Sequence, residues 1–258
     1  GGSNPIPLEQ GYFSPEEYAG YTRLWDDEFK GTSVNSANWT FETGDGCPNN
    51  CGWGNNELEY YRSENAWVAD DVLTIEARKE NYSGRSYTSA RMISKNKFSF
   101  QYGRVDIRAL LPKGQGLWPA LWMLGNNIST VGWPACGETD IMEMVGGSGR
   151  EKTVHGTCHW DVNGHAQYGL GYTKSSGTFA DEYHVFSIIW DESKIQWFVN
   201  NIQYCELNIT SADMSEFHQP NFFIMNVAVG GNWPGEPNSF TVFPQQMKVD
   251  YIRVFQKN

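Results

Sequence analysis

The chain has 258 residues, a formal net charge of −11, and 11 tryptophans within an aromatic content of 15%. The negative charge argues against nucleic-acid binding, which depends on neutralising phosphates, and it disfavours sulfated polyanions as substrates. No apolar run approaches the ~20 residues that a membrane span needs. We expect one domain over residues 1–258, with residues 1–20 as an N-terminal extension. Gly1–Ser3 looks like a cloning remnant, which leaves room for a leader removed earlier.

The N-terminal part contains one helix signal and one cysteine-rich loop. Ser14–Glu17 has the pattern of a capping box with proline at the first helical position, which predicts a short helix. Cys47 and Cys51 lie in a loop of Gly, Pro and Asn and are the best disulfide candidates. A zinc pair is the alternative, but no second pair with ligand spacing follows. Since five cysteines is an odd number, at least one is unpaired. The remaining three are expected to be buried thiols: Cys136, Cys158 and Cys205.

Segments of alternating polarity, rich in β-branched and aromatic residues, dominate the rest of the chain. One more helical turn is expected from Ser211. Many strands with almost no helix predict a sandwich or a barrel. Runs such as Phe222–Met225, apolar on both faces, suit the inner strands of two stacked sheets. The alternating segments are 72–78, 104–110, 186–190, 195–199, 222–229 and 249–255.

The last of these segments carries an isolated acid. Strict alternation along Lys248–Phe255 places Asp250 on the same face as Ile252 and Val254. A carboxylate there is expected either to pair with a cation or to bind a metal ion.

Three carboxylates lie within six residues at Glu138–Glu143, in a segment whose flanks have the pattern of a strand. Because successive strand side chains alternate faces, Glu138 and Asp140 point the same way and Glu143 points away from them. A one-residue bulge at Ile141–Met142 brings Glu143 round, so that all three acids line one groove.

The spacing of these acids indicates a reaction class. With the bulge, the Cα atoms of Glu138 and Glu143 are roughly 13 Å apart. Side chains that lean together then bring the carboxyl groups to roughly 5–6 Å, close to the ~5–5.5 Å of retaining glycosidases and short of the ~6.5–9.5 Å of inverting ones. An acidic edge strand that resists aggregation is the alternative. The apolar spacing within the segment and the tryptophans upstream of it disfavour that alternative.

A sugar groove needs apolar platforms for C–H faces and a few polar groups for hydroxyls. Trp118, Trp122 and Trp233 are predicted platforms, and core packing is the alternative for each. Glycine and proline beside Trp118 and Trp233 indicate accessible loops. His155 and His159 share one strand face, where a hydrogen-bonding role is expected for His159 and a buried, satisfied histidine is the alternative.

Together these segments resemble glycoside hydrolase family 16, and within it the endo-1,3-β-glucanases (laminarinases). The family signature Glu-x-Asp-x-x-Glu is found at Glu138–Glu143, although laminarinases usually carry Ile in place of Thr139. The signature alone is shared with agarases and carrageenases. The resemblance runs from about Tyr21 to the C-terminus. Its further segments are 52–61, 87–91 with 97–103, 114–125, 155–160, 222–235 and the ending 243–254.

The resemblance implies an all-β fold, a β-jelly-roll sandwich of two curved antiparallel sheets (concanavalin A-like) whose concave face forms the substrate groove. It implies a single catalytic domain that hydrolyses internal 1,3-β-D-glucosidic bonds with retention. Glu138 is then the nucleophile and Glu143 the acid/base, with a pKa raised by the neighbouring anions. Asp140 lies between them and orients Glu138, and His159 lies near the acid/base. Hydroxyls on the glycone side are expected to bind three further residues: Asn55, Arg91 and Asn226.

A structural calcium on the convex face is implied as well, held by Asp250, Glu28 and the carbonyl group of Asp71, with waters completing its shell. An ion pair of Asp250 with a nearby Arg or Lys is the alternative. The implied partner is a β-glucan polysaccharide or oligosaccharide, and the implied protein is a monomer that is secreted or held at the cell surface. Competing functions are a mixed-linkage 1,3-1,4-β-glucanase, another family 16 polysaccharide hydrolase, a non-catalytic β-glucan-binding protein and a lectin.

Overall fold

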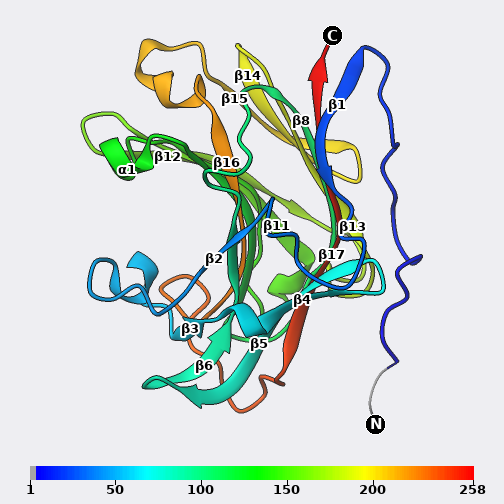
Figure 1. Ribbon diagram of the computed structural model, residues 1–258, viewed down its shortest axis with the longest axis vertical. Coiled ribbons are helices and arrows are strands. Elements are labelled where there is room, and N and C mark those ends of the chain that lie inside the picture. Colours follow the sequence, from blue (N-terminus) through cyan, green and yellow to red (C-terminus); the bar gives the residue numbers. More distant parts are fainter. Residues whose placement is uncertain (1–3) are drawn as a thin grey trace.

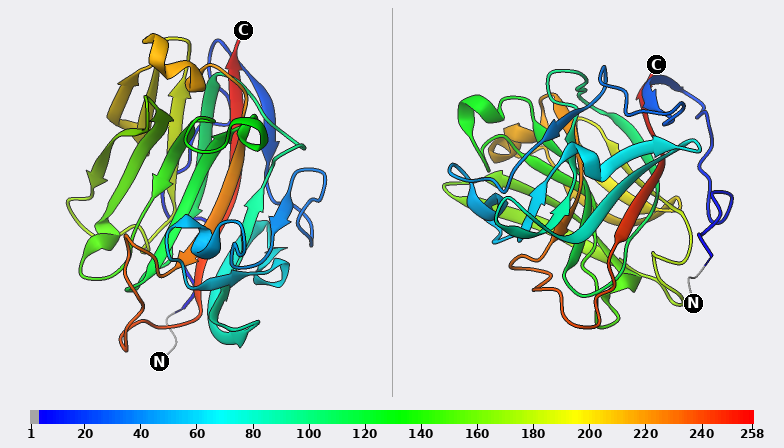
Figure 2. Two further views of the ribbon diagram at one scale, coloured as in Figure 1. Left: turned by 90° about the vertical axis from the view of Figure 1, so that its left-hand side faces the viewer. Right: turned by 60° about the horizontal axis from the view of Figure 1, so that its bottom comes forward.

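The computed structural model describes residues 4–258, and the predicted cloning remnant at residues 1–3 lies outside the described residues. Two curved sheets stack face to face in this part of the chain (Figures 1 and 2). All strand pairs are antiparallel except β3 with β6. The predicted β-sandwich is therefore confirmed.

The first sheet has seven strands among the described residues and carries most of the groove described below. Its order is β12-β11-β10-β9-β16-β7-β2. In that order the strands span His165–Thr173, Thr153–Asp161, Glu138–Glu143, Leu117–Gly125, Asn221–Val229, Arg91–Ile93 and Thr40–Glu42.

The second sheet has ten strands among the described residues. Its order is β15-β14-β13-β8-β17-β5-β6-β3, with β1 added to β17 and β4 added to β5. In that order the strands span Ile202–Asn208, Lys194–Val199, His184–Trp190, Gly103–Leu110, Gln245–Lys257, Val72–Tyr82, Arg85–Ser89, Glu59–Tyr61, Tyr21–Asp27 and Ala66–Ala69. The helical pieces are short: η1 Cys51–Gly54, η2 Ser63–Asn65, α1 Ile128–Val131, η3 Arg150–Lys152 and η4 Ala212–Phe217.

The core lies between the two sheets. All six segments predicted from alternation are strands, in β5, β8, β13, β14, β16 and β17. Their inward-facing residues are fully buried, among them Ile107, Met225 and Ile252. The Cys47–Cys51 disulfide is present, and the other three cysteines are buried free thiols, as predicted. The helical turn predicted from Ser211 is η4.

The helix predicted at Ser14–Glu17 is wrong, because this segment is irregular and runs along the outside of the ten-stranded sheet (Figure 1). The Ser14 N–H donates to the hydroxyl oxygen of Tyr251 at 3.0 Å, and the two hydroxyl groups lie 2.6 Å apart. The Ser14 side chain therefore bonds a residue of β17 instead of capping a helix.

The predicted orientation of Asp250 is also wrong. The register of β17 against β8 shifts between Val249 and Tyr251, which marks a bulge at Asp250. Val249 and Ile252 both belong to the core between the sheets, whereas the Asp250 carboxylate bonds Arg108. The extra residue changes the parity of the alternation, so Asp250 faces away from Ile252 and Val254.

Candidate active site

Strand β10 carries the three acids, and its register shifts in the middle of the motif. Against β11, Asp140 pairs with Thr157 and Glu143 with His155, which leaves one residue too many on β10. Against β9, the register likewise shifts between Asp140 and Met142. The predicted bulge at Ile141–Met142 is therefore present.

The bulge sends two consecutive side chains to the core side. Ile141 is 1% exposed and Met142 is fully buried. Glu138 and Glu143, at the two ends of β10, both line one cavity. Asp140 lies beneath them and is only 1% exposed.

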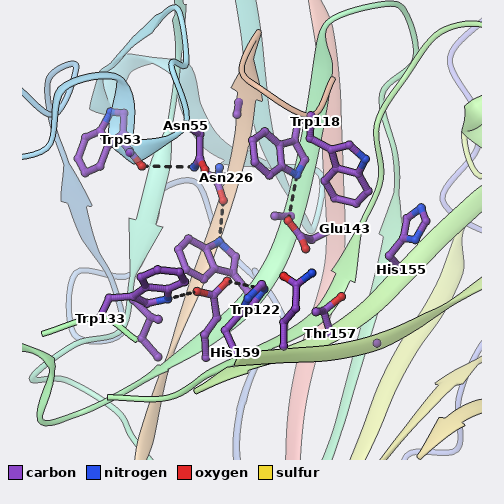
Figure 3. A pocket seen from close by; sticks show the side chains of 18 of the residues that line it. Trp53, Asn55, Trp118, Trp122, Trp133, Glu143, His155, Thr157, His159 and Asn226 are labelled. Atoms are coloured by element: carbon purple, nitrogen blue, oxygen red, sulfur yellow. Dashed lines mark hydrogen bonds and ion pairs between the residues drawn. The ribbon is translucent and has the colours of Figure 1, made fainter. Parts of the chain in front are cut away.

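The cavity has a volume of about 1030 Å³ and is formed across the seven-stranded sheet (Figure 3). Its lining includes side chains from strands β7, β9, β10, β11, β12 and β16, and from the loops at residues 50–57 and 233. All predicted substrate-binding residues are in that lining: Asn55, Arg91, Trp118, Trp122, His159, Asn226 and Trp233.

Each of the two glutamates accepts an indole N–H. The Trp133 indole donates to Glu138 at 2.6 Å, and the Trp118 indole donates to Glu143 at 3.0 Å. Nε2 of His159 lies 3.1 Å from an Asp140 carboxylate oxygen and 3.9 Å from one of Glu138. Both glutamate carboxyl groups are therefore held in place from the groove side.

Burial and mutual repulsion disfavour the ionised form of all three acids. Burial, with the nearby Glu138 carboxylate second, raises the pKa of Glu143 to about 7. Burial first and Asp140 second raise the pKa of Glu138 well above its usual value, while His159 and the Trp133 N–H oppose that rise. Burial and Glu143 raise the pKa of Asp140 in the same direction. Three crowded carboxyl groups of this kind retain a proton near neutral pH.

The expected position of His159 needs a correction. Strand register places His159 opposite Glu138, and it places His155 opposite Glu143. His159 therefore lies beside the predicted nucleophile and not beside the predicted acid/base. The expectation was wrong because the register between β10 and β11 decides which acid lies opposite His159. That register depends on the position of the bulge.

The groove has aromatic walls on both sides of the acids. At one end the Trp118 and Trp233 rings meet edge to face at 5.7 Å, and His155 packs on Trp233 at 5.0 Å. At the other end the Trp122 indole donates to Asn226 at 2.8 Å. These three tryptophans are thus groove residues, and Trp122 also packs against a small buried cluster beneath the groove.

Sequence reasoning missed several groove residues. The Trp133 ring lies 4.7 Å from that of His165 in a tilted arrangement, and its indole donates to Glu138. Trp53 also lines the cavity. Trp133 precedes Pro134 in the same kind of Gly/Pro context that singled out Trp118 and Trp233, so this signal was available. His165 comes from β12, and no local pattern marked it. Glu57 lies within the segment 52–61 that resembles the family, two residues before Glu59, but neither acid was singled out as a site residue.

Arg91 is held by both charge and aromatic rings. Its Nε donates to Glu42 at 2.9 Å, and its guanidinium carbon lies 4.5 Å from the Trp53 ring centre and 5.0 Å from that of Trp122. With Asn55 and Asn226 it forms a polar patch at this end of the groove.

Comparison with known proteins matches this architecture to a family. The family profile of the glycosyl hydrolases family 16 matches residues 50–253. The chain belongs to glycoside hydrolase family 16.

Individual relatives share most of this chain. A beta-glucanase of Rhodothermus marinus is 42% identical over 90% of this chain and 84% of its own length. The catalytic domain of an endo-1,3-beta-glucanase (laminarinase) from Thermotoga petrophila superposes with a TM-score of 0.86 at 46% identity, over 92% of this chain and 98% of that one. The clotting factor G alpha subunit of Tachypleus tridentatus is 41% identical over 90% of this chain, which spans only 34% of that protein.

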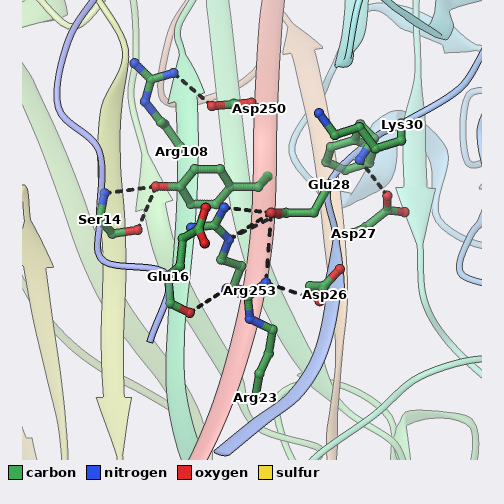
Figure 4. Close-up of polar contacts among 12 residues, drawn as sticks. Ser14, Glu16, Arg23, Asp26, Asp27, Glu28, Lys30, Arg108, Asp250 and Arg253 are labelled. Atoms are coloured by element: carbon green, nitrogen blue, oxygen red, sulfur yellow. Dashed lines mark hydrogen bonds and ion pairs between the residues drawn. The ribbon is translucent and has the colours of Figure 1, made fainter. Parts of the chain in front are cut away.

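Two of the three residues predicted to hold calcium in this family 16 chain, Asp250 and Glu28, have their carboxylates in separate ion pairs (Figure 4). Asp250 pairs with Arg108 at 2.9 Å, Glu28 with Arg253 at 2.6 Å, and Asp71 with Lys30 at 3.0 Å. The Asp250 and Glu28 carboxylates thus face arginine side chains in this arrangement, whereas the ligand predicted from Asp71 is its carbonyl oxygen and not the carboxylate that pairs with Lys30. Within residues 4–258, Glu138, Asp140 and His159 form a cluster of metal-ligand type, and that cluster belongs to the groove.

Proposed function

We propose that this chain is a retaining endo-1,3-β-glucanase that acts on laminarin-type glucans. One observation carries the proposal: the bulge in β10 presents Glu138 and Glu143 on the same side of the strand, in a groove walled by tryptophans. The names of similar proteins support the substrate, since the Thermotoga petrophila structure is a laminarinase and the Rhodothermus marinus relative a beta-glucanase.

In the proposed reaction Glu138 attacks the anomeric carbon and forms a covalent glycosyl-enzyme. Glu143 donates its proton to the leaving oxygen and then takes a proton from the incoming water, which attacks the same carbon and releases the product. A Glu143 pKa of about 7 supports a protonated acid at the start of the cycle. His159 and the Trp133 N–H favour the anionic form of Glu138, as a nucleophile requires.

Replacement of the nucleophile tests the assignment. Glu138→Ser is expected to abolish hydrolysis of laminarin while leaving oligosaccharide binding largely intact, measured by reducing-sugar release and by calorimetry. Glu206→Gln is the matched control, because Glu206 lies on β15 and is solvent-exposed. Substantial turnover by the Glu138 variant would remove the proposed role.

Product stereochemistry tests the retaining mechanism, and substrate range tests the preference for 1,3-β-glucan. Fresh product followed by NMR is expected to appear first as the β-anomer, and initial α-anomer would mean inversion. A time course on laminarin, lichenan, curdlan and agarose separates the 1,3-glucanase from the mixed-linkage and galactan alternatives. No hydrolysis of any of these glycans, with oligosaccharide binding retained, would favour the non-catalytic binding protein.

Location, assembly and calcium are further proposals. The Cys47–Cys51 disulfide supports an oxidising, extracellular location, because such bonds persist mainly outside the cytosol. A net charge of −11 supports a monomer through self-repulsion, which light scattering tests. Among the described residues, none of the helices has the length and apolarity to cross a membrane. Calcium binding requires Asp250 to leave Arg108, and melting with calcium or with chelator tests it.

A further inference from the structure

A chain of hydrogen bonds runs beneath the polar patch of Asn55, Arg91 and Asn226. Glu57, which is 4% exposed, lies at its centre. One of its carboxylate oxygens accepts from Asn55 Nδ2 at 2.9 Å, and the other accepts from the Tyr61 hydroxyl at 3.0 Å. Tyr61 in turn accepts from Asn226 Nδ2 at 3.1 Å. Glu57 therefore connects to both asparagines.

These bonds fix which atom each asparagine offers to the groove. Asn55 Nδ2 donates to Glu57 and also to the Trp53 carbonyl group at 3.3 Å, so both of its hydrogens are used. The side-chain oxygen of Asn55, Oδ1, has no donor within the described chain and is left as an acceptor. Amide orientation follows from the neighbouring groups in this way because an ionised carboxylate can only accept.

Asn226 is oriented in the opposite sense. Its Oδ1 accepts from the Trp122 indole, which can only donate, and one Nδ2 hydrogen goes to Tyr61. The second Nδ2 hydrogen has no acceptor within the described chain, and Asn226 lines the cavity. The groove therefore offers an acceptor at Asn55 and a donor at Asn226, and Figure 3 shows both side chains among the residues that line it.

The neighbouring acid Glu59 allows Glu57 to act as an acceptor on both oxygens. Glu59 is fully buried and accepts the Val229 N–H at 3.1 Å. Burial and the Glu57 carboxylate raise the pKa of Glu59 well above its usual value. Glu59 is thus the acid of this pair that retains a proton, whereas both oxygens of Glu57 face hydrogen-bond donors.

We infer that Glu57 is a positioning residue for substrate recognition: it sets the donor and acceptor pattern with which Asn55 and Asn226 bind glucosyl hydroxyls. A hydroxyl group can donate to Asn55 and accept from Asn226, so the patch is complementary to one or two equatorial hydroxyls of a neutral sugar. Glu57 itself contacts the two side chains and not the reacting atoms. This inference rests on the proposed glucanase function.

Glu57→Gln tests it with almost no change in shape. A glutamine places an NH₂ group against one of two donors, so either Asn55 or Tyr61 loses its acceptor. The KM for laminarihexaose is expected to rise about tenfold, as for loss of one hydrogen bond to a charged group, with kcat within about twofold of the parent. Tyr61→Phe breaks the link to Asn226 and is expected to raise KM in the same direction.

Glu206→Gln is the matched control. It makes the same chemical change at an exposed position of β15, outside the groove, so KM and melting temperature are expected to stay at the parent values. The inference is overturned if Glu57→Gln leaves KM unchanged, if it lowers kcat and melting temperature without raising KM, or if Glu206→Gln raises KM equally. Failure of the parent protein to hydrolyse laminarin would instead refute the proposed function, and binding of laminarihexaose by the same variants would still test the amide pattern.

Discussion

The hydrogen bond from Trp118 to Glu143 makes a pH-dependent prediction for Trp118→Phe. The indole N–H donates to the Glu143 carboxylate at 3.0 Å and lowers the pKa of that group. Burial and the Glu138 carboxylate raise it, and the net pKa is about 7. Phenylalanine keeps an aromatic ring for the sugar but has no N–H to donate. The Glu143 pKa is therefore expected to rise further. The catalytic proton then stays on Glu143 to higher pH, and the alkaline limb of kcat/KM moves upward.

The size of the shift follows from the value of the bond. A hydrogen bond to a charged acceptor contributes about 1.5–3 kcal/mol. Trp118 is partly exposed, so in the variant water replaces part of the lost hydrogen bond. The expected net loss is about 1.4 kcal/mol, which is equivalent to about one pKa unit. The alkaline limb is thus expected to move about one unit above its parent position.

The assay is kcat/KM for a laminari-oligosaccharide over the full pH range, where the limbs report the free enzyme. Trp122→Phe is the matched control, because its indole donates to Asn226 and not to a carboxylate. Both variants lose some sugar stacking, but only Trp118→Phe is expected to move the alkaline limb. An unchanged or lowered limb for Trp118→Phe, or an equal shift in the control, would refute the assignment of Glu143 as the acid.

Three further predictions concern stability, each read by thermal melting. Burial raises the folded-state pKa of Glu143 from 4.5 to about 7, so its contribution to stability is present below 4.5 and is lost as pH rises through 7. Glu143→Gln is therefore expected to stabilise the protein by about 3 kcal/mol at alkaline pH and not at acidic pH, and equal gains at both would contradict this. Arg108→Met leaves Asp250 and the carbonyl groups of residues 8, 10 and 12 without their cation, with an expected loss of about 3 kcal/mol. Gly156→Ala places a methyl group 2.4 Å from the Trp197 ring and is expected to cost about 1–3 kcal/mol, whereas an unchanged melting temperature would mean that the ring moves freely.

The acidic motif and the strands could be predicted from the sequence because their signals are local. Alternation within one strand is decided by its own residues, and the spacing of Glu138, Asp140 and Glu143 required a bulge before any neighbour was known. The Cys47–Cys51 pair was found in the same way, from four residues of separation in a turn-rich loop.

The errors arose where distant segments compete for the same groups. Ser14 has good capping chemistry, but the Tyr251 hydroxyl, 237 residues away, takes its N–H and its hydroxyl. Asp250 follows a clean alternation in sequence, yet a bulge against β8 turns it towards Arg108. His159 lies beside Glu138 because β11 pairs with β10 in one particular register.

The sequence by itself determined the chemistry that this protein carries: two glutamates on a bulged strand, tryptophan platforms and a sandwich of alternating strands. The tertiary structure alone decided how those groups are tuned, including the proton on Glu143, the partners of Asp250, and the amide orientations that Glu57 sets. The physical reason is that burial, charge and hydrogen-bond partners come from strands far apart in the chain. Their values are fixed only when the two sheets pack.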